Sequence, residues 1–532
     1  MSRELCRSEN FFYTVARDDT EIEECARKQV GDDSYMFARE RNANEDNLLT
    51  QQLERLWNTD FNERVVNKSS LSVEDKRALE MMEQSLKRKD GHFQVALLWR
   101  EKPVKIPNNK PMAEKRLESL KRRLKKDGEL FDKYKRAMQD YIDKGHAERI
   151  PKKELEEKSS KIWYLPHHPV THRLKPEKVR VVFDYAAKYE GQSLNMQLPQ
   201  GPDLTNSLAG VLIRFREEPV ALVADIESMF YQVLVDPDDY NAFRFLWWEN
   251  NNLDERPTEY RMVKHVFGAT SSPSYANFCL QKTGSIYGGE YDEEVSEAIK
   301  RNMYVDDLMK SVTNTERAIM IAQQLRELLQ RGGFKLTKWL SNDREVLMTI
   351  PETERASSVV NLNIDDLPTE TALGLKWNVE EDAFIWEVDD RTLVQTQQKA
   401  STRRGILSVV SSLFDPLGMI APFIMKAKLL LQELCRKKLE WDEEIEELEG
   451  KQWLRWLSDL SKLKKVKVER CFRPYDFGEV KRTELHVFSD GSRVGYGAVA
   501  YLRLVDDDDR IHCSFIIGRA RVAPIREITI PR

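Results

Sequence analysis

Three aspartates in two places could do chemistry in this sequence. Asp225 follows the apolar run 220–224, and Asp306 and Asp307 stand side by side between two short apolar segments. Adjacent carboxylates at a hairpin tip repel each other, and a bound cation relieves that repulsion. Carboxylates that share two metal ions about 3.5–4 Å apart can activate an attacking hydroxyl and steady a leaving pyrophosphate. The pattern favours two-metal nucleotidyl transfer, although paired aspartates also occur in ordinary solvated turns.

Short strands must position these aspartates. Apolar and β-branched runs predict strands on both sides of each aspartate, and longer patterns with helical spacing predict helices between them. The predicted strands are 218–225, 231–235, 242–248 paired with 259–266, 302–304 and 308–311, and the predicted helices are 274–287 and 315–330. Asp225 therefore ends a strand, and Asp306 and Asp307 lie in a turn.

The remaining chain shows the same mixture of helical and extended patterns. Residues 1–50 are polar and predict a poorly ordered leader, and Ser72 is a candidate cap for a helix through Leu86. Further helices are predicted over 112–145, 402–413 and 422–437, and strands over 161–165, 179–183, 371–390, 484–501 and 510–517. The pattern predicts an α+β fold.

Charge and composition limit the function classes. The net charge is −5, but residues 100–190 hold 25 Lys and Arg against 15 Asp and Glu. Such a locally basic region suits a phosphate backbone, although each basic cluster could also be a solvated helix face. Six scattered cysteines form no CxxC pair, and no signal peptide or membrane span is visible, so we expect an intracellular protein without a membrane partner.

Several strings together resemble reverse transcriptases. Tyr304-Val305-Asp306-Asp307 resembles their catalytic box, residues 225–232 resemble their first metal-binding box, and 267–274 resemble the box that supports template and nucleotide. More narrowly, five strings resemble BEL/Pao-type LTR retrotransposons: 164–170, 179–184, 201–204, 224–230 and 414–418. The resemblance covers roughly residues 50–532.

The resemblance implies a set of metal and nucleotide sites. Asp225, Ile226, Asp306 and Asp307 would form the site of two Mg²⁺ (or Mn²⁺) ions. The resemblance implies four residues that bind the incoming dNTP. Arg180 would contact the triphosphate, Phe230 would exclude a 2′-hydroxyl, and Gly268 would let the backbone approach the nucleotide closely. Lys338 would lie near the pyrophosphate, with Lys335 as the open alternative. Phe267 stands where many relatives have glutamine. Gly374, Lys376 and Trp377 resemble the hairpin that grips the primer end.

The C-terminal region resembles the start of an RNase H domain. Residues 486–492 and 495–501 resemble its first two strands, with Asp490 as its first metal ligand, and the sequence stops at Thr529–Arg532. We therefore expect a truncated domain without RNase H activity. The order of residues at 490–492 disfavours an aspartic protease, and His167, His168 and His172 predict a structural rather than a metal-binding role.

The resemblance implies a right-hand polymerase with fingers, an antiparallel palm sheet and a thumb. The expected parts are a leader (1–50), a basic helical extension (51–150), fingers and palm (151–345), primer-grip hairpins (346–400), a helical thumb or connection (401–479) and a truncated RNase H-like sheet (480–532). The implied function is RNA-directed DNA polymerase acting on RNA and DNA template-primer with dNTPs. The alternative is an inactive or host-captured copy that binds nucleic acid without copying it, and the sequence leaves the oligomeric state open.

Overall fold

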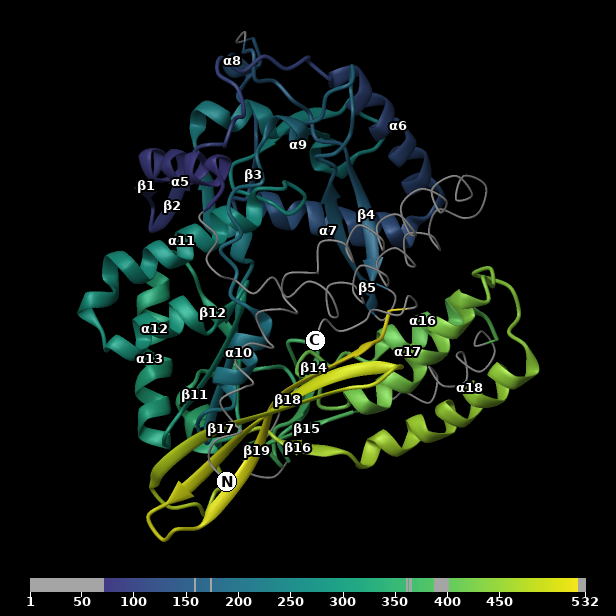
Figure 1. Ribbon diagram of the computed structural model, residues 1–532. Coiled ribbons are helices and arrows are strands. Elements are labelled where there is room, and N and C mark those ends of the chain that lie inside the picture. Colours follow the sequence, from purple (N-terminus) through teal and green to yellow (C-terminus); the bar gives the residue numbers. More distant parts are fainter. Residues whose placement is uncertain are drawn as a thin grey trace.

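A computed structural model describes residues 71–156, 159–172, 175–359, 362, 366–386 and 401–524. The predicted leader (1–50), the first part of the basic extension and the string Thr529–Arg532 lie outside these residues. Helices and several small, mostly antiparallel sheets follow one another along the chain (Figure 1), which confirms the mixed α+β prediction.

The elements of residues 73–197 form the upper part of Figure 1. They are α5 (Val73–Ser85), β1 (Lys87–Lys89), β2 (His92–Val95), α6 (Lys110–Lys126), α7 (Gly128–Asp143), β3 (Ala147–Arg149), α8 (Lys152–Leu155), β4 (His167–His172), β5 (Lys175–Phe183) and α9 (Leu194–Gln197). The Ser72 hydroxyl accepts from the Asp75 amide at 3.0 Å, as predicted for this cap. The β1–β2 hairpin was not predicted; it turns at Asp90-Gly91, a pair that readily adopts the positive φ angles of a tight turn.

The predicted helical region 112–145 is two helices rather than one. The chain breaks at Asp127, whose carboxylate accepts from the Leu130 amide at 2.9 Å and so caps α7. Both helices bury the apolar positions that the helical spacing indicated: Leu117, Leu120, Leu124, Tyr134 and Met138.

The strand predicted over 161–165 is wrong. This segment is extended but makes only a single bridge, between Tyr164 and Arg244, and the Asn109 side chain bonds both the amide and the carbonyl of Tyr164. The amides of Trp163 and Leu165 donate to the carbonyls of Asn241 (3.0 Å) and Arg244 (2.7 Å), so the segment lies beside residues 241–244 without forming a regular strand. Nearby, buried His167 bonds the Tyr134 hydroxyl (2.6 Å) and the Leu246 carbonyl (2.9 Å), which fits the structural role expected for it.

A four-stranded antiparallel sheet lies at the centre of the chain, in the order β10–β11–β6–β12. Its strands are β6 (Val220–Ile226), β10 (Met303–Tyr304), β11 (Asp307–Val312) and β12 (Leu336–Ser341). Between β6 and β10 the chain forms η2 (Met229–Gln232), β7 (Val233–Val235), η3 (Pro237–Phe243), β8 (Arg244–Trp247), η4 (Glu249–Asn251), β9 (Thr258–Met262), α11 (Ser272–Tyr287), η5 (Gly288–Glu290) and α12 (Glu293–Arg301). The predicted pairing of 242–248 with 259–266 is confirmed as β8–β9.

The two faces of this sheet bury different cores. On β6, Leu222, Ala224 and Ile226 pack in the core shared with α11, α12 and α13 (Thr315–Arg331). Ala221 packs in the core of α10 (Leu208–Phe215) and the following elements. Because side chains alternate along a strand, Asp225 belongs to the face of Ala221, away from α11–α13.

A second four-stranded sheet and a helical layer follow. The sheet is β13 (Thr369–Ala372), β14 (Leu375–Asn378), β15 (Ala383–Ile385) and β16 (Lys467–Glu469), and the helices are α14 (Arg344–Thr349), η6 (Glu352–Glu354), α16 (Arg403–Ser412), α17 (Ala421–Arg436), α18 (Glu447–Leu460) and η7 (Ser461–Lys465). The hairpin predicted within 371–390 is β13–β14–β15, and the helices predicted over 402–413 and 422–437 are α16 and α17. At Gly418 (φ +74°) an added Cβ would lie 1.9 Å from the Gly518 carbonyl oxygen, so glycine is required where this segment meets the last strand.

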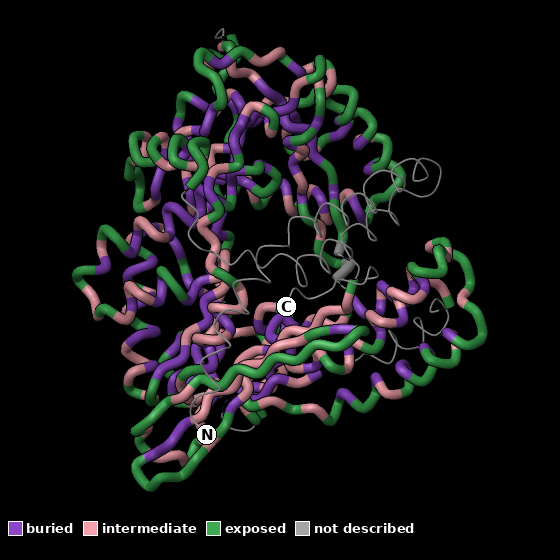
Figure 2. Tube along the Cα trace, viewed as in Figure 1, coloured by how far each residue is buried: buried purple, intermediate pink, exposed green. Residues whose placement is uncertain are grey.

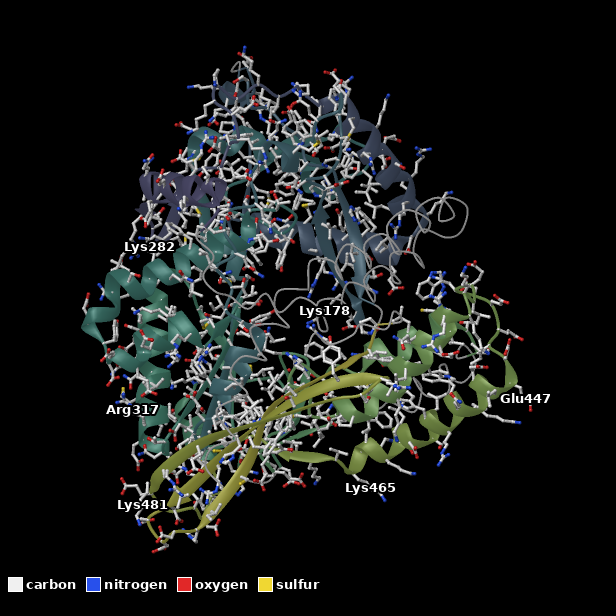
Figure 3. All side chains as sticks on the ribbon, viewed as in Figure 1. Lys178, Lys282, Arg317, Glu447, Lys465 and Lys481 are labelled. Atoms are coloured by element: carbon white, nitrogen blue, oxygen red, sulfur yellow. The ribbon has the colours of Figure 1, made fainter. Side chains whose placement is uncertain are left out.

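Three 12-residue strands form the last described sheet: β17 (Val480–Gly491), β18 (Gly495–Asp506) and β19 (Ile511–Val522). β19 packs on α17, whereas β17 pairs only with β18 within the described chain. Much of β17 is exposed (Figure 2), and its exposed residues include the apolar Leu485, Val487 and Phe488. Charged residues such as Lys282, Arg317 and Lys481 lie on the outer surface (Figure 3).

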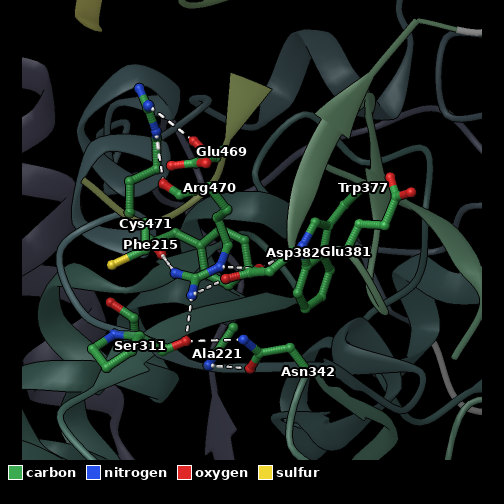
Figure 4. Close-up of polar contacts among 12 residues, drawn as sticks. Phe215, Ala221, Ser311, Asn342, Trp377, Glu381, Asp382, Glu469, Arg470 and Cys471 are labelled. Atoms are coloured by element: carbon green, nitrogen blue, oxygen red, sulfur yellow. Dashed lines mark hydrogen bonds and ion pairs between the residues drawn. The ribbon is translucent and has the colours of Figure 1, made fainter. Parts of the chain in front are cut away.

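Two buried arginines, Arg470 and Arg216, link segments of the two four-stranded sheets, and Arg216 also reaches β19; Figure 4 shows Arg470 and its partner Asp382. Arg470 donates to the carbonyls of Glu218 (2.9 Å) and Pro219 (2.6 Å) and pairs with both carboxylate oxygens of Asp382 (2.6 and 2.8 Å). Arg216 donates to carbonyls of β16 and β19. Each guanidinium thus satisfies backbone groups from segments far apart in the sequence.

Candidate active site

Asp225 and Asp307 lie directly opposite each other on neighbouring strands. They are paired in the register of β6 and β11, and the Ile226 amide donates to the Asp306 carbonyl at 2.8 Å. That hydrogen bond makes the Asp225–Asp307 pair the non-hydrogen-bonded type, in which the Cα atoms approach to about 4.5 Å and the side chains share one face. The antiparallel register thus brings together two carboxylates far apart in the sequence.

Asp306 occupies the two-residue turn between β10 and β11. Tyr304 pairs with Asp307, so Val305 and Asp306 form the tip of the hairpin. Val305 has φ +55°, a conformation that a β-branched residue rarely adopts and that usually calls for glycine. Such strain is often stored at functional sites. The tight turn places all three aspartates at one end of the sheet.

The electrostatics of the three carboxylates are strongly coupled. Burial, followed by the charges of Asp306 and Asp225, raises the pKa of the Asp307 carboxyl from 3.8 to about 7. Burial and the charge of Asp225 also raise the pKa of Asp306. The nearby ammonium of Lys338 lowers both pKa values but does not cancel the increase. The single ammonium of Lys338 therefore does not balance burial and the repulsion among the carboxylates.

Lys338, rather than Lys335, faces these carboxylates. The Lys338 Nζ lies 2.9 Å from Asp225 Oδ2, whereas the Lys335 Nζ lies 3.7 Å from a carboxylate oxygen of Glu354. The sequence left open which of the two lysines lies near the aspartates. In the structure it is Lys338.

The carboxylate oxygens of Asp225, Asp306 and Asp307 are ligands of the kind that a divalent cation prefers. Mg²⁺ and Mn²⁺ prefer oxygen ligands, and a cation would relieve the repulsion that raises the pKa of Asp306 and Asp307. Among the described residues, however, no three His, Cys, Asp or Glu side chains are gathered closely enough to hold a metal ion. Ile226 could contribute only main-chain atoms, because its side chain is buried in the core.

Phe230 and Phe267 form an aromatic pair. Phe230 is 5% exposed and Phe267 is 60% exposed, and their ring centroids lie 4.2 Å apart. Tyr231 belongs to a different cluster, where its hydroxyl donates to the Tyr141 hydroxyl and its ring stacks on His146. This leaves Phe230 as the candidate for sugar selection, and the apolar Phe267 ring covers it.

Gly268 and Arg180 lie where β5 meets the segment after β9. Gly268 has φ +110°, and a Cβ there would lie 2.6 Å from the Phe183 carbonyl oxygen. Only glycine fits at this position, because the backbone of β5 lies against it. Arg180 is exposed on β5. Burial raises the pKa of Tyr141, and the charge of Arg180 partly offsets that increase.

The candidate primer-grip residues are split between surface and core. Gly374 (φ +90°) makes the turn between β13 and β14, where a Cβ would collide with the Phe414 ring at 2.6 Å. Lys376 is partly exposed, but Trp377 is fully buried against Phe215. Trp377 can therefore support the hairpin but cannot contact a primer with its side chain, which corrects its predicted place in the site.

Asp490 lies on the exposed strand β17, opposite Gly497. Its carboxylate accepts from the Gly491 amide at 2.9 Å. Asp225, Asp306 and Asp307 all belong to the β10–β11–β6–β12 sheet and its turn, whereas Asp490 belongs to the β17–β18–β19 sheet.

Sequence patterns did not reveal three features of the site: the strain at Val305, the contact of Phe267 with Phe230, and the ion pair of Lys338. Only the first had a local signal, because a two-residue connection between two strands demands a positive φ. The other two depend on residues distant in the sequence.

Comparison with known families bears on the C-terminal region. Residues 402–532 match the family model described as Pao retrotransposon-like RNaseH-like domain. The Pao-type resemblance is therefore confirmed for residues 402–532. The Pao-type match takes in α16–α18 as well as β17–β19, so it begins upstream of residue 480, where the sequence predicted the RNase H-like part to begin. No curated protein matches the chain.

Solved structures similar to this chain include three of one viral protein. They are the foamy viral protease-reverse transcriptase dRH in complex with ds DNA (13% identity, TM-score 0.46, covering 89% of this chain and 68% of that one), the protease-reverse transcriptase with an RNA/DNA hybrid (13%, 0.42, 90% and 52%) and the same protein with dsDNA (13%, 0.45, 90% and 81%). The chain thus spans about half of the hybrid-bound protein. In the described residues, no helix is both long and apolar enough to traverse a bilayer.

Proposed function

We propose that the chain is an RNA-directed DNA polymerase of a BEL/Pao-type LTR retrotransposon that extends a primer on an RNA or DNA template with dNTPs. The observation that carries this proposal is the position of Asp225 opposite Asp307, with Asp306 in the adjoining turn. In this arrangement the β10–β11–β6–β12 sheet is the palm, the upper elements are the fingers, and α16–α18 are the thumb or connection.

Three carboxylates would hold two Mg²⁺ (or Mn²⁺) ions: Asp225, Asp306 and Asp307. The bound ions would lower the pKa of the attacking 3′-hydroxyl and neutralise the leaving pyrophosphate. Arg180, exposed on β5, would bind the nucleotide triphosphate, because a guanidinium forms paired hydrogen bonds with phosphate oxygens. Phe230 would exclude a 2′-hydroxyl, and Gly268 would keep the backbone close to the nucleotide.

A basic helix surface supports nucleic acid as the partner. The exposed side of α6 carries five cations that form no ion pair within the described part of the chain: Lys115, Arg116, Arg122, Arg123 and Lys126. Its buried side packs Leu117, Leu120 and Leu124 into the fingers, so the basic side is held rigidly outward. Such a surface attracts phosphates by releasing their counterions.

Replacement of Asp306 by Asn tests the proposal. We expect Asp306→Asn to slow primer extension by about a hundredfold or more, equivalent to about 2.7 kcal/mol in the barrier, because it removes one ligand charge. Template-primer binding should stay within about twofold of wild type, since phosphate contacts lie elsewhere. A matched control, Asp476→Asn, changes an exposed aspartate in the turn before β17, outside the palm sheet, and should extend like wild type.

The same assay separates polymerase from the alternative, a copy that binds nucleic acid without copying it. If the wild-type chain binds template-primer but extends no primer with either Mg²⁺ or Mn²⁺, the alternative holds. Wild-type extension by Asp306→Asn would remove the carboxylate mechanism.

A further inference from the structure

Strand β12 contains an extra residue next to Asp225. Thr337 pairs with Asp225 and Leu340 pairs with Val223, so two residues of β12, Lys338 and Trp339, stand opposite the single residue Ala224. This is a β-bulge, a feature that redirects side chains and is common beside active sites.

The bulge exchanges the faces of two side chains. In a regular strand, Lys338 would share the face of Ala224 and point into the core of α11–α13. With the extra residue, Trp339 is buried in that core instead (1% exposed), and the Lys338 side chain lies outside, 66% exposed, with its Nζ 2.9 Å from Asp225 Oδ2. The bulge is therefore what brings the ammonium to the carboxylates.

The backbone at Lys338 is strained in a way that packing does not explain. Its φ is +54°, the left-handed conformation that a bulge of this kind usually assigns to glycine. A lysine at this position is disfavoured by about 1–2 kcal/mol relative to its ordinary conformation. An exposed ion pair offers at most a comparable stabilisation, so stability alone does not account for lysine here.

We propose that Lys338 is a built-in counter-ion for the aspartate site: its ammonium occupies the cation position at Asp225 in the metal-free protein and gives up that carboxylate when a divalent cation binds. The inference rests on the proposed function, because it assumes that Asp225 is a metal ligand. It assigns Lys338 a positioning role, in which the lysine keeps the repelling carboxylates together before the cation arrives and competes with the cation for Asp225.

Mn²⁺ binding to the purified full chain tests this competition, with the electron paramagnetic resonance signal of free Mn²⁺ as the readout. Lys338→Gly removes the ammonium and supplies the residue that the bulge prefers, so we expect Mn²⁺ to bind about two- to fivefold more tightly, the range of an exposed ion pair. Lys338→Arg keeps a cation beside Asp225 and should bind Mn²⁺ like wild type. Lys335→Ala, which removes a lysine that faces Glu354, is the matched control and should also bind like wild type.

Thermal unfolding in EDTA separates the backbone from the charge. Lys338→Gly should melt within about 3 °C of wild type, because relief of the left-handed strain offsets the lost ion pair, whereas Lys338→Ala should melt below Lys338→Gly. Both variants should show the same tighter Mn²⁺ binding, because both lack the ammonium.

The outcomes distinguish this inference from the proposed function. If Asp225→Asn weakens Mn²⁺ binding but Lys338→Gly binds Mn²⁺ no more tightly than wild type, the counter-ion inference is overturned and the metal site stands. If Asp225→Asn binds Mn²⁺ like wild type, the aspartate site itself is wrong, and the inference falls with it.

Discussion

The carboxylate of Asp307 should destabilise the metal-free fold. Its pKa rises from 3.8 to about 7, with burial as the first cause and the charges of Asp306 and Asp225 as the next. A carboxyl whose pKa is higher in the folded state binds its proton more tightly there than in the unfolded chain. Between about pH 4 and pH 7 the unfolded chain is therefore ionised while the folded protein is still protonated, and the free energy of unfolding falls as the pH rises.

The magnitude follows from the pKa change. An increase of about three in pKa corresponds to about 4 kcal/mol, which is a ceiling because the carboxyl is partly exposed to solvent. Asparagine has the same shape without the charge. We expect Asp307→Asn to stabilise the metal-free protein by about 2–4 kcal/mol at pH 8 and by less than about 1 kcal/mol at pH 4.

Urea unfolding in EDTA, followed by tryptophan fluorescence at both pH values, measures this difference. Asp476→Asn is the control for removing a surface charge and should change stability by less than about 0.5 kcal/mol at either pH. The reasoning is refuted if Asp307→Asn is no more stable than wild type at pH 8. A stabilisation of equal size at pH 4 and pH 8 would also refute it, because that result would come from packing rather than from charge.

Two further predictions concern sugar selection and the junction between the sheets. Phe230→Ala should raise the ratio of ribonucleotide to deoxyribonucleotide incorporation about tenfold or more, because the smaller side chain leaves room for a 2′-hydroxyl; a ratio unchanged in single-nucleotide kinetics would identify another residue as the gate. Arg470→Met should lower the free energy of unfolding by about 3–5 kcal/mol in urea, because it leaves the buried carbonyls and Asp382 without their partner, and a loss below about 1 kcal/mol would contradict the structural role of this arginine.

Local patterns in the sequence indicated the three candidate aspartates and predicted the elements that carry them. The apolar run before Asp225, the paired aspartates between short apolar segments, and the helical spacing over 315–330 each depend on neighbours within a few residues. The same holds for the cap at Ser72. These features were predicted because alternation and capping are encoded within one element.

Tertiary structure alone decided how these elements meet. Strand alternation would place Lys338 on the core face; the bulge in β12 moves it to the face of Asp225 by adding one residue between the pairs with Asp225 and Val223. The bulge has no signature in a single strand, because it is defined by the register against its neighbour. In the same way, the burial of Trp377 depends on partners supplied by other parts of the chain. The sequence thus determined which side chains are available, and long-range pairing decided which of them face one another.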